Sequence, residues 1–253
     1  MNIVTSLDEW LLIRKKLSGK SIGFVHTMGN LHAGHISLCV RSMEMNEITV
    51  AAIFVNREQF NQQSDYDLYP RTITEDIALL SRHDIDYLLL FDDKIIFPDQ
   101  YQIHVSEIET SNVLEGKYRP GHFTGMLTIV NKFLNIVRPT FSYYGEKDYQ
   151  QLLLIKKMVN ALFLSVEIIA CPTIRAEDNL ALSSRNSRLS SVQRKKAAQF
   201  PALLQSNTLP SEIKFKLQES GFKVDYVEDK WQRRLGAVWL DDVRLIDNFA
   251  LVV

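Results

Sequence analysis

Apolar and β-branched runs alternate with helical stripes along the first two thirds of the chain. The run at 48–55 (ITVAAIFV) is almost entirely apolar, which is typical of a strand buried on both faces of a parallel sheet. Shorter apolar runs predict further strands at 22–25, 87–91, 141–144 and 166–170. Such strands need helices on both faces of their sheet.

Helical spacing of apolar residues fills the stretches between these strands. It predicts helices at 36–45, from Thr72 to about Arg82, at 124–137 and at 148–162. Thr72 and Glu75 have the spacing of a capping box at the start of the second helix. Alternating strands and helices imply right-handed βαβ crossovers, so we predict an α/β fold with a Rossmann-like, doubly wound parallel sheet over residues 1–173.

The pattern changes beyond Asn186. It predicts two helices and then three short strands, at 193–205, 211–219, 222–227, 237–240 and 244–246. We therefore expect a small C-terminal α+β domain over residues 174–253. The length of 253 residues agrees with one or two domains of about 150 residues each.

Composition narrows the class of protein. Hydrophobic residues make up 46% and charged residues 23%, and the net charge is −1, so we expect a globular protein that binds neither nucleic acid nor an anionic membrane through bulk charge. No apolar run reaches the ~18 residues of a membrane span, and no basic leader precedes the first apolar stretch. Cys39 and Cys171 are too few for a disulfide framework. We expect two buried thiols in a cytoplasmic protein.

Four loops that follow predicted strands carry the candidate chemistry, because ligands of open parallel sheets bind outside the carboxyl ends of the strands. They are 26–35, 56–60, 145–151 and 172–186.

The first loop holds His32 and His35 around Gly34, at the start of a predicted helix. A helix N-terminus offers free N–H groups to a phosphate, and a glycine lets it approach the backbone. The pair predicts a site for the α-phosphate of a nucleotide. Chance pairing is one alternative. A zinc site is another, although no third ligand stands close by and no HExxH is present.

The other loops offer cations, hydroxyls and amides. Lys147 follows a glycine at a strand end, and Ser183, Ser184 and Arg185 stand in a row. These groups suit a triphosphate. Taken alone, however, Lys147 is better explained as a solvated lysine at a helix start, and an ordinary serine-rich loop explains the other three residues equally well. Gln59 and Gln151 can recognise a small polar substrate, or lie on the surface. No P-loop motif is present, so the chain is not a P-loop protein. No GxGxxG motif is present either, so a dinucleotide cofactor and redox chemistry are unsupported, which leaves activation by ATP.

Several segments match one family in order. They are TMGNLHAGH (27–35), FVNREQF (54–60), YPRT (69–72), EGKYRPGHFTGMLTIV (115–130), GEKDYQQ (145–151), LALSSRN (180–186) and LIDN (245–248). With them the chain closely resembles the pantoate-β-alanine ligase family, within the superfamily of HxGH nucleotidyltransferases. Two positions depart from the family pattern, since His26 and Arg57 stand where it usually has proline.

The resemblance implies a two-step reaction. Pantoate and ATP would give pantoyl adenylate and pyrophosphate, and β-alanine would then displace AMP to form pantothenate. Mg²⁺ would accompany the ATP, and the enzyme would be a homodimer. Residues 1–173 would form the ATP- and pantoate-binding catalytic domain, and residues 174–253 a lid.

The resemblance also assigns residues. His35 would be the catalytic acid with His32 as its partner, and Lys147 and Arg185 would contact phosphates. Gln59, Gln151, Tyr69 and Arg119 would bind pantoate and β-alanine, and Asp76 would reach magnesium through water. The implied ATP site comprises Met28, Gly29, Asn30, Leu31, His32, Ala33, Gly34, His35, Gly145, Glu146, Lys147, Asp148, Ile174, Leu182, Ser183, Ser184 and Arg185.

Two other functions remain open. An HxGH enzyme that adenylylates a phosphate monoester would need basic residues where this chain has Gln59 and Gln151. A nucleotide-binding protein without catalysis is the second, and the retained His32, His35 and Lys147 argue against it.

Overall fold

The computed structural model describes residues 1–251 as two compact units. The first unit contains Met1–Gly145 and Gln150–Cys171, and the second contains Glu146–Tyr149 and the chain from Pro172 onward. Nothing in the sequence pattern separates residues 146–149 from the helix that follows them.

The first unit is built on a six-stranded sheet in which every pair of neighbours is parallel. Its order is β1-β4-β3-β2-β5-β6. The strands are β1 (Asn2–Val4), β2 (Ile22–Thr27), β3 (Ile48–Ile53), β4 (Tyr87–Leu89), β5 (Phe141–Gly145) and β6 (Glu167–Cys171). The strand order reverses between β2 and β5, which is the position where doubly wound sheets bind their ligands.

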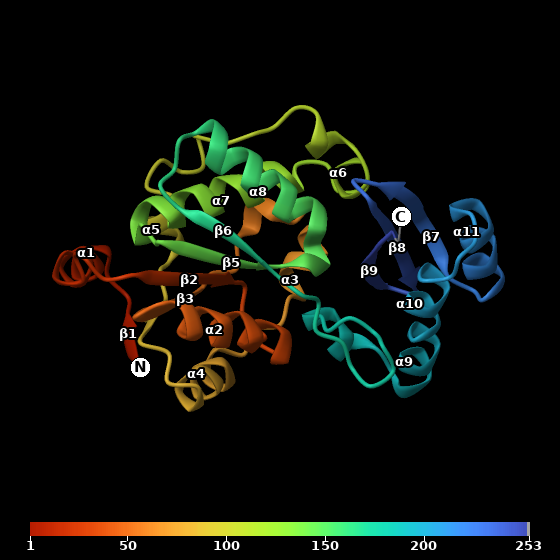
Figure 1. Cartoon of the computed structure of the whole chain (residues 1–253), viewed down its shortest axis with the longest axis horizontal. Helices are drawn as coiled ribbons and strands as arrows, with labels where there is room; N and C mark the ends of the chain where they lie inside the picture. The colour runs from red at the N-terminus through yellow and green to blue at the C-terminus, as the bar shows by residue number, and fades with distance from the viewer. Residues whose placement is uncertain (252–253) are drawn as a thin grey trace. The chain divides into compact units, whose positions relative to one another are not determined.

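Helices cover both faces of this sheet (Figure 1). On one face Cys39 of α2 (Ala33–Met45) and Leu80 of α4 (Ile73–Arg82) pack with Val25 and Ala51 of the strands. On the other face Phe133 of α7 (His122–Val137) packs against Phe24 and Phe54. Helix α8 (Tyr149–Ala161) lies on the same side (Figure 1). The predicted doubly wound α/β fold is confirmed.

The main helices of the first unit are α1 (Leu7–Lys16), α2 (Ala33–Met45), α4 (Ile73–Arg82), α7 (His122–Val137) and α8 (Tyr149–Ala161, whose first residue belongs to the second unit). Short helical segments are η1 (Arg57–Gln59), α3 (Gln63–Asp67), α5 (Asp93–Ile96), η2 (Thr110–Asn112) and α6 (Glu115–Tyr118). None of the helices in the described part of the chain is long and apolar enough to cross a membrane.

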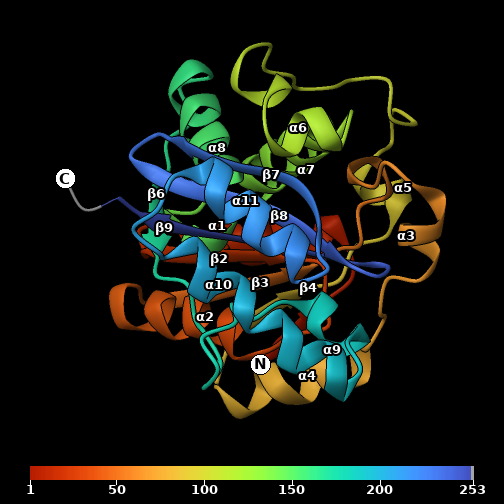
Figure 2. The same cartoon turned by 90° about the vertical axis from the view of Figure 1, so that its right-hand side faces the viewer.

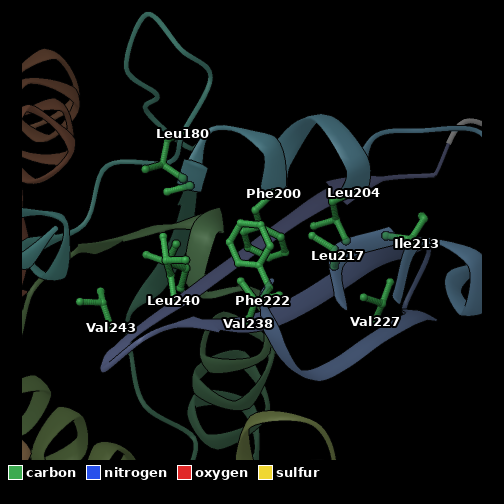
Figure 3. Packing of buried hydrophobic residues seen from close by; sticks show 12 residues of the cluster. Leu180, Phe200, Leu204, Ile213, Leu217, Phe222, Val227, Val238, Leu240 and Val243 are labelled. Atoms are coloured by element: carbon green, nitrogen blue, oxygen red, sulfur yellow. The ribbon is translucent and has the colours of Figure 1, made fainter. Parts of the chain in front are cut away.

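The second unit contains a three-stranded antiparallel sheet, β7 (Lys223–Lys230), β8 (Arg233–Leu240) and β9 (Val243–Ala250). Its helices are η3 (Glu146–Asp148), η4 (Ser184–Arg188), α9 (Ser191–Ala197), α10 (Gln199–Leu204) and α11 (Pro210–Glu219). The helices α10 and α11 cover one face of the sheet (Figure 2). Figure 3 shows the core between these helices and the sheet, where Phe200 of α10 and Leu217 of α11 pack with Val238 of β8. The expected α+β architecture is confirmed.

The single helix predicted at 193–205 is wrong in one respect. The structure divides it into α9 and α10 at Ala198. Pro201 lies in the first turn of α10, and because proline has no backbone N–H it cannot continue the hydrogen-bond ladder from α9. The break lets Phe200 and Leu204 of α10 turn into the core.

Candidate functional site

The loop after β2 is held by a buried carboxylate. Asp76 of α4 is 3% exposed, and its two oxygens accept the backbone N–H groups of Asn30 at 2.9 Å and Leu31 at 2.8 Å. The predicted capping box of α4 is wrong, because the hydroxyl of Thr72 donates to Asp76 at 3.2 Å and caps no backbone group. The expected contact of Asp76 with magnesium through water stays a prediction.

Gly29 lets the loop turn tightly against this carboxylate. Its φ is +82°, in the left-handed region, and a Cβ at this position would lie 3.0 Å from Asp76 Oδ2. Both the backbone conformation and the close approach favour glycine. The turn delivers the chain to the first residue of α2.

The two histidines of the HxGH motif cap α2 together. His32 is the N-cap residue, and its Nδ1 accepts the N–H of Gly34 at 3.1 Å. His35 returns the interaction, since its Nδ1 accepts the N–H of His32 at 3.3 Å. Imidazoles here take the places that Ser or Thr and Glu hold in an ordinary capping box.

This reciprocal cap fixes the chemistry of both rings. A nitrogen that accepts a hydrogen bond carries no proton, so each neutral ring holds its proton on Nε2. The ring centroids of His32 and His35 lie 4.1 Å apart. Two Nε2–H donors therefore stand side by side at the positive end of a 13-residue helix, where an anion is stabilised.

Gln59 lies close to the same loop. Its side chain is buried, and its Nε2 lies 2.7 Å from the sulfur of Met28. Asn56, which is fully buried, directs its Nδ2 to Gln59 Oε1 at 3.4 Å and to the carbonyl of Gly125 at 3.0 Å. The structure thus brings two predicted site residues together and adds Asn56, which the sequence analysis did not single out.

His122 connects Gln59 to Arg119. A carbonyl only accepts, so His122 Nδ1 donates to the carbonyl of Gln59 at 2.8 Å, and His122 Nε2 must accept from Arg119 Nη1 at 3.0 Å. Glu115 holds the same guanidinium group, with 3.7 Å between Oε2 and Nη1. Arg119 and Gln59 therefore belong to one cluster, and His122 was a signal within the RPGHFTG segment that the sequence analysis left without a role.

Tyr69 and Gln151 are the other two residues that the sequence analysis assigns to the substrates. The ring of Tyr69 is 7% exposed and packs edge-on against Phe60 at 5.5 Å. Gln151 is half-buried in α8. Its neighbour Gln150 is structural, because its buried amide donates to the carbonyls of residues 110 and 113 and accepts the N–H of residue 115.

The two departures from the family pattern differ in their surroundings. The ring of His26 lies 4.7 Å from that of Phe133, and its Nε2 is buried without a hydrogen-bond partner among the described residues. Burial lowers the pKa of His26 to about 4, so this imidazole is neutral at pH 7. Arg57 is exposed and donates to Gln63 at 3.3 Å.

In the second unit, one connected segment carries the predicted hydroxyls and guanidinium. The N–H of Leu182 donates to the carbonyl of Ile174 at 2.9 Å. Ser183 follows as the N-cap of η4, with its hydroxyl accepting the N–H of Arg185 at 3.3 Å. Ser184 is half-buried. The structure therefore places residues 182–185 in sequence at the start of η4 and joins them to Ile174 by a backbone hydrogen bond.

Lys147 lies in η3, also within the second unit. Its side chain is 17% exposed, and Nζ lies 3.7 Å from Asp148 Oδ1. Asn248 binds the backbone carbonyls of Glu146 and Lys147. The sequence analysis quoted the segment that contains Asn248 without giving it a role.

Neither unit contains a resident metal site among residues 1–251, since no three His, Cys, Asp or Glu side chains gather as ligands there. Magnesium prefers one or two carboxylates together with the phosphates of a substrate.

Known proteins resemble the chain over its full length. A family model described as pantoate-beta-alanine ligase matches residues 1–250. Pantothenate synthetase of Legionella pneumophila (strain Corby) is 47% identical, covering 99% of this chain and 100% of the relative. That of Coxiella burnetii (strain RSA 493 / Nine Mile phase I) is also 47% identical, over 97% of this chain and 95% of the relative.

Solved structures agree. Pantoate-beta-alanine ligase from Francisella tularensis, complexed with beta-gamma ATP and beta-alanine, has a TM-score of 0.94 at 41% identity and covers 99% of this chain and 97% of its own. Pantothenate synthetase from Thermus thermophilus has a TM-score of 0.90 at 36% identity, with 99% of both chains covered.

Proposed function

Because the chain belongs to the pantoate-beta-alanine ligase family, we propose that this enzyme condenses pantoate with β-alanine through a pantoyl adenylate and releases AMP and pyrophosphate. The observation that carries the proposal is the pair of imidazoles at the N-terminus of α2. Their Nδ1 atoms are engaged by the backbone, which presents two Nε2–H donors to an anion.

In the first step a carboxylate oxygen of pantoate attacks the α-phosphorus of ATP. A new P–O bond forms as the bond between the α-phosphorus and the bridging oxygen breaks, and pyrophosphate leaves with the electron pair. Charge grows on the α-phosphate and on the leaving oxygen. His35 acts as the acid and His32 as its partner, and preorganised donors of this kind stabilise such charge strongly.

In the second step the amine of β-alanine attacks the acyl carbon of the adenylate. A C–N bond forms, the bond between the acyl carbon and the phosphate oxygen breaks, and AMP leaves. The nitrogen loses a proton to give the amide of pantothenate. The structure of the Francisella tularensis ligase, which was solved with beta-gamma ATP and beta-alanine, supports these two co-substrates.

Neutral amides suit the recognition of a small hydroxy acid. Gln59 and Gln151 bind pantoate, Gln59 also meets β-alanine, and Arg119 attracts the carboxylates. Tyr69 closes the pocket with its buried ring. The contact of Gln59 with Met28 supports the role of Gln59, because it places the Gln59 amide beside the loop 28–35 that we assign to ATP.

The phosphates are bound by cations and by backbone. Lys147 and Arg185 contact the triphosphate, and the remaining ATP contacts come from residues 28–35, 145–148, 174 and 182–184. Mg²⁺ would accompany ATP and offset the phosphate charge, and Asp76 would reach it through water. Residues 1–173 form the catalytic domain, and residues 174–253 form the lid.

We further propose that the enzyme is a cytoplasmic homodimer, as the resemblance to the family implies. Both cysteines are buried and neither forms a disulfide, which suits a reducing compartment. Burial raises the pKa of Cys39 to about 12. Sedimentation velocity tests the oligomeric state. A monomer at micromolar concentration would contradict it.

Product analysis tests the function. The purified enzyme is incubated with Mg·ATP and pantoate, with and without β-alanine, and AMP, pyrophosphate and pantothenate are followed by mass spectrometry. Pantothenate and AMP should appear in equal amounts when β-alanine is present. Binding of ATP without any product contradicts the proposal.

A further inference from the structure

The LIDN segment of β9 ends in two buried polar residues that the proposed reaction does not use. Asp247 is 3% exposed and Asn248 is 2% exposed. Burying a polar side chain is unfavourable unless it is hydrogen-bonded, so the partners of these two side chains indicate why they are there.

Asn248 fastens the segment that carries Lys147. Its Nδ2 donates to the carbonyl of Glu146 at 3.0 Å and to the carbonyl of Lys147 at 2.9 Å. Its Oδ1 accepts from Arg233 Nε at 2.5 Å. Both amide protons and the amide oxygen are therefore used, and one side chain crosslinks β9 to two successive peptide groups of η3.

Arg233 of β8 holds the same segment on either side of the lysine. Its Nη1 lies 3.4 Å from Glu146 Oε2, and its guanidinium lies over the ring of Tyr149, 4.6 Å from the centroid. The backbone of Lys147 is thus fixed from the sheet of the second unit, while its ammonium nitrogen lies 3.7 Å from Asp148 Oδ1.

Asp247 binds a second segment of the proposed ATP site to the same strand. Its carboxylate binds Arg175 in a bidentate pair at 2.7 and 2.8 Å, and Arg175 directly follows Ile174. Asp247 Oδ1 also accepts the N–H of Asn248 at 2.8 Å. Adjacent residues of β9 therefore hold the segments 146–147 and 174–175.

We propose that Asn248 is the positioning residue for Lys147, so that the phosphate-binding lysine is set by β9 of the second unit and not by β5, the strand it follows. The inference rests on the proposed contact of Lys147 with the triphosphate. The lysine side chain is flexible, so binding of its ammonium group to a phosphate costs conformational entropy. If the backbone carbonyls of residues 146 and 147 are already fixed, less entropy is lost on binding.

A double-mutant cycle tests this. Asn248→Ala should lower kcat/KM for ATP by about five- to a hundredfold, the range expected when a buried hydrogen-bonding group loses its partner. Lys147→Ala should lower it further. The double variant should match Lys147→Ala alone, because without the lysine there is nothing left to position.

Two further variants keep the test sharp. Asn248→Asp keeps the shape of the side chain and the acceptor for Arg233 but removes both N–H donors. It should therefore lower kcat/KM for ATP as Asn248→Ala does, and it serves as the test if the alanine variant fails to fold. Gln205→Ala removes another amide of the second unit, one that accepts from Asn179 at 3.1 Å, and should leave kcat/KM unchanged.

The outcomes separate the two claims. If Lys147→Ala is impaired but Asn248→Ala and Asn248→Asp are not, the positioning role is wrong while the proposed function stands. If the effects of Asn248→Ala and Lys147→Ala multiply in the double variant, Asn248 acts independently of the lysine, which also overturns the inference. If Lys147→Ala has no effect, the phosphate role of Lys147 fails, and the inference fails with it.

Discussion

The imidazoles of His32 and His35 serve the helix and the reaction with different nitrogen atoms. Nδ1 of each ring accepts a backbone N–H at the start of α2, and Nε2 is the donor that we assign to the phosphates. The capping role and the phosphate-binding role of a histidine can therefore be separated by substituting it with asparagine or glutamine. Asparagine places a polar atom near the position of Nδ1, and glutamine places one near the position of Nε2.

His35→Asn should keep the cap and lose the phosphate donor. We expect kcat to fall by about 100- to 1,000-fold, the usual effect of removing one preorganised donor, with a melting temperature close to that of the wild type. His35→Gln serves as the matched variant, and it should recover part of the rate. Equal rates for the two variants would argue against an Nε2 donor.

Asp76→Asn should loosen the loop that carries Met28 to His35. The amide retains one acceptor for the two N–H groups of Asn30 and Leu31 and places its own donor against the other, which costs about 1–3 kcal/mol of stability for a buried group. The measurement is urea unfolding together with KM for ATP. An unchanged KM for ATP would show that the carboxylate does not shape the nucleotide loop.

Some site residues could be read from the sequence and others could not. His32, His35 and Gly34 stand together in one loop, so spacing reveals them. The roles of His122 and Asn248 come from contacts with backbone 63 and 101 to 102 positions away. A side chain that holds a distant carbonyl leaves no periodic signal, and for that reason these two were found only in the structure.

At the scale of elements, α7 approaches the turn η1 so closely that only glycine fits between them. A Cβ on Gly125 would overlap the carbonyl group of Glu58. This close contact places Asn56 and His122 within hydrogen-bonding distance of Gln59. The position of the Gln59 amide, to which we assign the substrate, therefore depends on the packing of a helix against a three-residue turn.

Gly125→Ala should push η1 away from α7. We expect a loss of about 1–3 kcal/mol in the free energy of unfolding from overpacking, and a higher KM for pantoate with little change in the affinity for ATP. Asn131→Ala, on the same helix, is the control and should change neither. A shift in ATP affinity equal to that for pantoate would contradict the assignment of η1 to the acid.

Element prediction succeeded where the apolar pattern was long. The run at 48–55 and the stripe at 124–137 became β3 and α7. The segments β1 and α1 were not predicted, since β1 has three residues and only one of them is buried, and Trp10 is the one buried residue of α1. Burial of a single residue gives no period to detect.

For the whole molecule, the buried imidazole of His26 makes the free energy of unfolding depend on pH. Its pKa is about 4 in the folded chain against 6.5 for the free group, so the unfolded chain binds the proton first as the pH falls. Above pH 6.5 the His26 ring is neutral in both states and its contribution to the free energy of unfolding is fully present. As the pH falls from 6.5 to 4, the free energy of unfolding drops by about 3 kcal/mol because only the unfolded chain takes up this proton.

His26→Phe removes this titration and keeps an aromatic ring beside Phe133. The difference in the free energy of unfolding between the variant and the wild type, measured by urea denaturation at several pH values, should move in favour of the variant as the pH falls from about 7 to about 4. Carboxylates titrate in both proteins and cancel in the difference. Parallel curves would mean that His26 is not buried as a neutral ring.

The central claim is that a carboxylate oxygen of pantoate attacks the α-phosphorus of ATP. Pantoate labelled with ¹⁸O in its carboxylate tests this most directly, with Mg·ATP and β-alanine present and AMP and pyrophosphate analysed by mass spectrometry. We predict one ¹⁸O atom in each AMP and none in pyrophosphate, because the carboxylate oxygen that bonds to the α-phosphorus leaves with AMP when the acyl carbon–oxygen bond breaks. Label in phosphate or pyrophosphate, or unlabelled AMP formed together with pantothenate, would contradict the adenylate route.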